Sequence, residues 1–142
     1  MAIDTVWTGE KWGISASFSP NGKYLVALAG PWAFGGMGMN VSEGKIAINH
    51  DRQIFLHSLE TGETTPITRD FNPSVTSAHW HKTDNKIYLQ VSEEDYGRLY
   101  SYDHNNRKFT RIETGVDMIS SVSYAINSHF AVYQGNKANK YS

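Results

Sequence analysis

The sequence contains no cysteine among its 142 residues. This excludes disulfide bridges, thiolate metal sites and cysteine nucleophiles, and it leaves the redox compartment undetermined. Long hydrophobic runs are also lacking, since no segment approaches the roughly 18 apolar residues of a membrane-spanning helix. Residues 1–8 have neither a basic start nor an apolar core, so we expect no secretory signal peptide there.

An excess of positive charge is lacking as well. The sequence has 13 Lys and Arg against 14 Asp and Glu, for a formal net charge of −1. Binding to nucleic acid needs basic side chains that neutralise phosphates, so we expect no nucleic-acid partner, and we expect no membrane partner. Aromatic residues are abundant at 13% of the chain. Because these side chains favour pleated surfaces, the composition favours a β-rich domain.

A pattern of strands and turns recurs along the chain with different residues. A short strand that ends in an aromatic residue, a polar turn and an apolar strand follow one another over residues 13–28, 75–90 and 119–133. The second and third copies lie about 44 residues apart, a spacing typical of four-stranded propeller blades. One such sheet cannot bury both of its faces, so repeated sheets stack. The repeat therefore predicts an all-β fold, a partial β-propeller of about two and a half four-stranded antiparallel blades.

Polar turn clusters indicate where these units begin and end. We expect a first blade at about 13–68 with an insertion at 30–50, a second blade at about 74–114 and a partial third blade at about 119–135. The strands of the second blade are expected near residues 75–81, 86–92, 97–103 and 108–113. Residues 3–7 fit the outer strand of a further blade. These units cover most of the chain with one kind of repeat.

The aromatic residues Phe18, Trp80 and Tyr124 occupy equivalent positions in the three copies. We expect them to form core between blades, with a platform for stacking a ligand as the alternative. A propeller avoids exposed strand edges by closing a ring of about 4–8 blades. Two and a half blades leave an apolar face and a strand edge uncovered, so we expect the isolated chain to self-associate or to be a piece of a larger protein.

The insertion at residues 30–50 is the least generic segment. It places Trp32, Phe34, Met37 and Met39 among several glycines. Such an insertion often reaches a substrate, a neighbouring domain or a second subunit, so these four residues are our candidates for that contact. The alternatives are an ordered loop that packs its own aromatic rings, and direct binding of a ligand.

The sequence contains no complete catalytic constellation. It has no Gly-x-Ser-x-Gly nucleophile elbow. His79 and His81 flank a tryptophan in a predicted strand, where the two-residue period puts both imidazoles on one face. Two ligands alone do not make a zinc site, so we interpret them as solvated or hydrogen-bonded histidines. The run Gly35-Gly-Met-Gly lacks the Lys-Ser/Thr of a phosphate loop. We therefore expect no catalytic residue, no cofactor and no metal.

Three segments carry a family resemblance. Ser19-Pro-Asn-Gly-Lys is similar to a phrase that recurs in propellers of the prolyl oligopeptidase family and of TolB-like proteins. Residues 54–68 resemble the third and fourth strands of the same blades. The insertion Pro31-Trp-Ala-Phe-Gly-Gly-Met-Gly-Met-Asn looks like a bacterial peptidase branch of the prolyl oligopeptidase family. The resemblance covers most of the chain.

This resemblance implies a function in a larger protein. In the prolyl oligopeptidase family, an N-terminal propeller gates peptide entry to a C-terminal α/β-hydrolase domain that bears the catalytic triad. The chain resembles only the propeller, so its implied role is non-catalytic, with a hydrolase domain and a peptide substrate as partners. The resemblance also suggests a periplasmic or extracellular location. The alternative is a TolB-like propeller module that binds a protein partner and has no peptidase attached.

Overall fold

The computed structural model describes residues 14–39, 52–71, 73–93, 96–114, 118–124 and 130–135. Ten strands and one helical turn lie in these residues: β1 (Ser15–Phe18), β2 (Tyr24–Ala29), α1 (Ala33–Gly36), β3 (Gln53–Ser58), β4 (Thr64–Pro66), β5 (Ser74–Trp80), β6 (Lys86–Glu93), β7 (Tyr96–Asp103), β8 (Lys108–Ile112), β9 (Met118–Tyr124) and β10 (Phe130–Gly135). The expected outer strand at residues 3–7 and most of the insertion lie outside the described residues.

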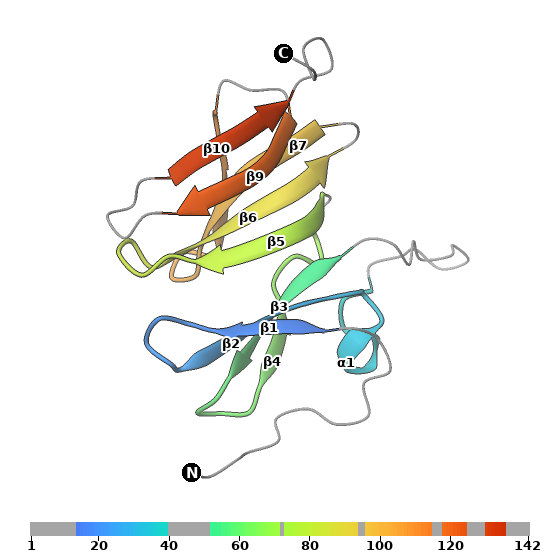
Figure 1. Ribbon diagram of the computed structural model, residues 1–142. Coiled ribbons are helices and arrows are strands. Elements are labelled where there is room, and N and C mark those ends of the chain that lie inside the picture. Colours follow the sequence, from blue (N-terminus) through green and yellow to red (C-terminus); the bar gives the residue numbers. More distant parts are fainter. Residues whose placement is uncertain are drawn as a thin grey trace, which may run out of the picture.

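The strands form three antiparallel sheets that follow one another along the chain (Figure 1). Blade 1 has the strand order β1-β2-β3-β4, blade 2 has the order β5-β6-β7-β8, and blade 3 consists of β9 and β10. Every pairing joins strands that are consecutive in sequence, as expected when short polar turns link them. The all-β expectation of two four-stranded sheets and a partial third is confirmed.

The turns between strands are built from the polar clusters that the sequence shows. In the β1–β2 turn, the Ser19 hydroxyl accepts the Tyr24 N–H at 3.0 Å, and the Asn21 side chain accepts the Lys23 N–H at 3.0 Å. Gly22 has a φ of 71°, a backbone conformation that glycine adopts without a steric penalty. Together these contacts let the chain reverse within a few residues, which fixes the register of β1 against β2.

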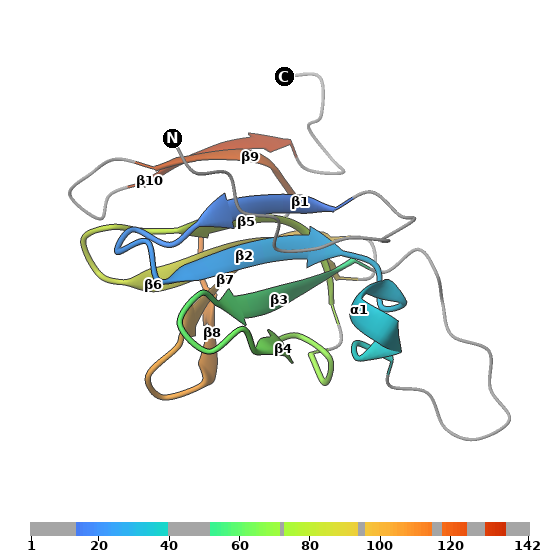
Figure 2. The ribbon, with the colours of Figure 1, turned by 90° about the horizontal axis from the view of Figure 1, so that it is seen from below.

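The largest core cluster lies between blade 1 and blade 2. Its buried members are Val26, Leu28, Ile54, Leu56, Val75, Trp80, Ile87, Leu89, Val91 and Tyr102. Residues of β2 and β3 that point to one face alternate with residues that point to the other, so each blade offers one apolar face to its neighbour. Figure 2 shows β2 and β3 of blade 1 running beside the strands of blade 2. Burial between sheets therefore holds the two blades together.

A second contact joins blade 2 to blade 3. Tyr88, Leu99 and Ile119 are buried there, and Val122 and Tyr124 pack against them. Trp80 and Tyr124 thus lie between blades, as their repeat position predicts. Phe18, the third member of that set, is 67% exposed, so its assignment to the core is wrong. Trp80 and Tyr124 each pack on the blade that precedes their own, whereas no described sheet precedes β1.

The described residues contain no helix long and apolar enough to cross a membrane.

Candidate functional site

The four candidate residues of the insertion lie in a segment that folds back on blade 1. We call residues 31–39, which include α1, the cap segment. Phe34 and Met37 pack on a buried cluster that contains Phe55, and the Phe34 and Phe55 ring centroids lie 4.9 Å apart. Met39 folds towards Gly36. Trp32 is 45% exposed, the highest exposure of the large side chains in this segment.

The cap segment covers the face of blade 1 that lies away from blade 2. Ala27 and Ala29 of β2 point to this face and are fully buried, together with Ala33 of α1. Their small side chains leave room for the backbone of the cap segment. The Gln53 amide donates a hydrogen bond to the Gly38 carbonyl at 2.8 Å, which ties the end of the segment to β3. Contact of these residues with a substrate, domain or subunit stays a prediction.

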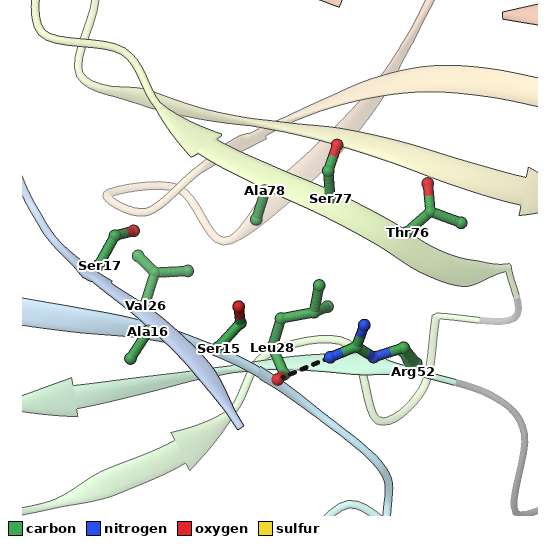
Figure 3. Close-up of a pocket in the computed structure, with 9 residues that line it drawn as sticks. All are labelled: Ser15, Ala16, Ser17, Val26, Leu28, Arg52, Thr76, Ser77 and Ala78. Atoms are coloured by element: carbon green, nitrogen blue, oxygen red, sulfur yellow. Dashed lines mark hydrogen bonds between the residues drawn. The ribbon is translucent and has the colours of Figure 1, made fainter. Parts of the chain in front are cut away.

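An inner cleft of about 280 Å³ lies between blade 1 and blade 2 (Figure 3). It is lined by Ser15, Ala16, Ser17, Val26, Leu28, Arg52, Thr76, Ser77 and Ala78. The first strand of each blade, β1 and β5, forms its two walls. Hydroxyl groups thus face the cleft, and Arg52 is the one charged residue among the nine described residues that line it. The repeat explains this composition, because both strands carry small polar residues beside their aromatic ends.

Arg52 enters the inner cleft from the residue before β3. Its guanidinium donates a hydrogen bond to the Leu28 carbonyl at 3.3 Å. Its backbone N–H donates to the Ser74 hydroxyl at 3.0 Å, and its carbonyl accepts the Val75 N–H at 2.9 Å. Both blades therefore position this residue. Sequence reasoning missed Arg52, because the cleft exists only after strands from separate blades come together.

An outer cleft of about 540 Å³ lies between blade 1 and the β7–β8 hairpin of blade 2. It is lined by Tyr24, Leu56, Ser58, Thr61, Glu63, Thr65, Pro66, Ile67, Asp70, Tyr102, His104, Arg107 and Phe109. Its wall contains an aromatic group in which the Tyr24 and His104 rings lie 5.1 Å apart and the Tyr102 and Phe109 rings lie 4.7 Å apart. Aromatic side chains, carboxylates and a guanidinium thus meet in one concavity.

The histidine pair lies at the contact between blade 2 and blade 3. The His79 ring stacks on Tyr124 with centroids 4.2 Å apart, and the His81 ring lies 5.8 Å from His79. Burial, and then the charge of His81, lowers the pKa of His79 below its usual 6.5. Burial raises the pKa of Tyr124 to about 12. A neutral imidazole stacked on a protonated phenol makes a packing contact, whereas the sequence interpretation expected solvated or hydrogen-bonded histidines.

Among the residues that the structure describes, no group of three or more His, Cys, Asp or Glu side chains could hold a metal ion. The buried His81 instead accepts the Thr83 N–H on its Nδ1 atom at 3.2 Å, and Tyr88 donates a hydrogen bond to the Asp84 carboxylate. These side chains satisfy the β5–β6 turn.

No protein-family model matches the chain, and no curated protein matches it. Among solved structures, the chain is similar to the crystal structure of TolB from Acinetobacter baumannii, with a TM-score of 0.65 and 15% sequence identity. The match covers 94% of this chain and 29% of that chain, so the chain spans less than a third of the TolB length. At this identity the likeness shows the fold alone, a part of the TolB β-propeller. None of the comparisons assigns the chain to the prolyl oligopeptidase family.

Proposed function

We propose that this chain is a TolB-like propeller segment that binds a protein partner and has no peptidase activity of its own. The observation that carries the proposal is the outer cleft of about 540 Å³ between two stacked blades. Aromatic residues and arginine are enriched in the centres of protein interfaces, where they supply contact area and directed hydrogen bonds. The outer cleft offers both kinds of side chain.

The arrangement of the outer cleft suits an extended segment of a partner. Tyr24 and Phe109 are partly buried, so their rings leave apolar surface open to a side chain that enters the cleft. Glu63, Asp70 and Arg107, all exposed, add two negative charges and one positive charge to the lining. Opposite charges at the edge of an interface favour one orientation of the partner over the other. A short peptide with an apolar residue between charged neighbours is therefore the expected ligand.

The comparisons support the TolB-like module over the peptidase alternative. The solved structure that the chain resembles over 94% of its length is that of TolB. The finer peptidase interpretation, in which this chain positions peptide for a hydrolase domain, has no support from the comparisons.

The test is selection of peptides from a displayed random library on the immobilised chain, followed by calorimetry with a selected peptide. Thr65 is exposed and lines the outer cleft, so Thr65→Trp fills the cleft with an indole ring. We expect this variant to bind the peptide at least about tenfold more weakly. Thr110→Trp is the matched control, because Thr110 is an exposed strand residue outside the cleft lining.

Three results would overturn the proposal. The library yields no peptide above background, the Thr65→Trp variant binds as tightly as the wild type, or the chain hydrolyses peptides in a reaction that a serine-directed reagent blocks. The last result would restore the peptidase interpretation.

A further inference from the structure

We propose that the inner cleft binds the carboxylate of a small aliphatic acid, with Arg52 as its charged anchor. This inference goes beyond the proposed function, because the inner cleft and the outer cleft have no lining residue in common. The proposal rests on charge, on the hydroxyl groups of β1, on the apolar walls and on the fixed position of Arg52.

Among the nine described residues that line the inner cleft, Arg52 is the only charged one, and it contributes a guanidinium. Ion pairs among the described residues join Arg69 to Asp70, His81 to Asp84 and Arg111 to Glu113, and none of them includes Arg52. A guanidinium has five N–H donors, and one nitrogen of Arg52 donates to the Leu28 carbonyl. Its other donors suit the two oxygens of a carboxylate.

The hydroxyl groups divide into two kinds. On β5, Thr76 donates to the Gln90 carbonyl at 3.0 Å and Ser77 donates to the Gln90 side chain at 3.4 Å. The hydroxyl protons of these two residues therefore already take part in hydrogen bonds within the chain. On β1, the Ser15 and Ser17 side chains are exposed. Figure 3 shows them on the strand opposite β5, on the same side of the cleft as the Leu28 carbonyl. Ser15 pairs with Leu28, whose carbonyl accepts the Arg52 bond, so the Ser15 hydroxyl is the one placed to donate to an anion that Arg52 attracts.

The size and walls of the cleft favour a carboxylate over a phosphate. Val26, Leu28 and Ala78 give it apolar surface, and its volume of about 280 Å³ suits a short aliphatic group. One guanidinium balances the single negative charge of a carboxylate, whereas a phosphate dianion would keep an unbalanced negative charge there. The guanidinium bond to Leu28 of blade 1 and the backbone bonds to Ser74 and Val75 of blade 2 hold Arg52 in place before a ligand arrives, which lowers the entropic cost of binding.

The experiment is a titration of the ¹⁵N-labelled chain, followed by NMR, with two ligands that differ only in charge. N-acetyl-L-valine carries the carboxylate of a peptide C-terminus, and N-acetyl-L-valinamide lacks it. We expect saturable shifts in β1, in β5 and at the Arg52 side chain with the acid, with a dissociation constant on the order of millimolar. The amide should bind at least about tenfold more weakly. Butyrate in place of N-acetyl-L-valine distinguishes a free short-chain acid from a peptide C-terminus, and binding of either supports the proposal.

The matched variants are Arg52→Gln and Arg69→Gln. Arg69 is an exposed arginine outside the cleft, so its variant should bind the acid like the wild type. Arg52→Gln should lose at least about tenfold in affinity, and Arg52→Lys should lose less because the charge remains. Equal binding of acid and amide by the wild type would overturn the proposal without any variant. Full competition by inorganic phosphate, or undiminished binding by a folded Arg52→Gln variant, would overturn it too.

Failure of this proposal and failure of the proposed function are distinguishable. Thr65→Trp changes the outer cleft alone, so it should leave the titration with N-acetyl-L-valine unchanged.

Discussion

At the scale of single residues, Gly38 shows how closely the cap segment lies on blade 1. A Cβ at this position would lie 2.5 Å from Gln53 Oε1, 3.0 Å from Phe55 Cζ and 3.1 Å from Pro31 Cα. The Gln53 side chain cannot easily withdraw, because its amide donates to the Gly38 carbonyl. We therefore expect Gly38→Ala to lower the free energy of unfolding by about 1–3 kcal/mol, measured by urea denaturation.

Gly30→Ala is the control for this prediction. Gly30 precedes the cap segment, and a Cβ there would meet no atom within 4 Å. This variant should unfold at nearly the same urea concentration as the wild type. If the free energy of unfolding fell equally in the two variants, helix or loop propensity, and not the close approach to β3, would explain the destabilisation by Gly38→Ala.

Single residues also show where sequence reasoning ends. The composition of the insertion identified Trp32, Phe34, Met37 and Met39 as a group, but which of them pack depends on Ala27 and Ala29, which leave space on blade 1. Phe34 also has a φ of 55°. Aromatic residues seldom adopt this left-handed conformation, so the sequence alone does not predict it. Arg52 was invisible for a related reason, since its cleft combines residues from two blades.

At the scale of elements, Gly97 sets the distance between blade 2 and blade 3. A Cβ at this position would lie 2.8 Å from the carbonyl oxygen of Ile119 and 3.0 Å from its nitrogen. Both are backbone atoms, so β9 must move away from β7 to admit a methyl group. We expect Gly97→Ala to lower the free energy of unfolding by about 1–3 kcal/mol and to speed amide hydrogen exchange in β9 more than in β2.

Ser92→Ala is the matched control, because Ser92 is exposed and pairs with Gly97 across the sheet. It should leave the exchange rates of β9 as they are in the wild type. A Gly97→Ala variant with unchanged exchange in β9 would mean that blade 3 does not rely on this close contact.

The strands themselves were largely predictable. The four strands of blade 2 lie within one residue of the expected ranges at each end, because alternation and polar turns are local signals. The packing partner of a strand is not local. Phe18 has the same repeat position as Trp80, yet it is 67% exposed and Trp80 is 7% exposed, since only Trp80 has a described blade before it.

At the scale of the whole molecule, the fold could be predicted and the function could not. The repeat carries the propeller architecture, and the likeness to part of TolB agrees with it. A peptidase needs a catalytic domain, and the repeat holds no information about one. The clefts lie between blades, and their linings come from residues as far apart as Tyr24 and Phe109. Such sites emerge from stacking, and a repeat pattern predicts only that stacking occurs.

The same stacking argues for association between copies of the chain, which stays a prediction here. Trp80 of blade 2 stacks on Tyr24 of blade 1 with ring centroids 5.8 Å apart. Likewise, Tyr124 of blade 3 stacks on His79 of blade 2. Phe18 has the equivalent position and remains 67% exposed, so a further sheet can cover it as blade 1 covers Trp80. We expect sedimentation equilibrium to show a mass that rises with concentration, and Phe18→Ser to weaken the association by at least about tenfold.

Leu59→Ser is the control, because Leu59 is an exposed apolar residue in the β3–β4 turn and not at the repeat position. It should associate like the wild type if a blade surface, rather than general hydrophobicity, drives the contact. A wild-type chain that stays monomeric at all concentrations would contradict the prediction. In that case copies of the chain would not stack on one another in solution, and Phe18 would be an ordinary exposed side chain.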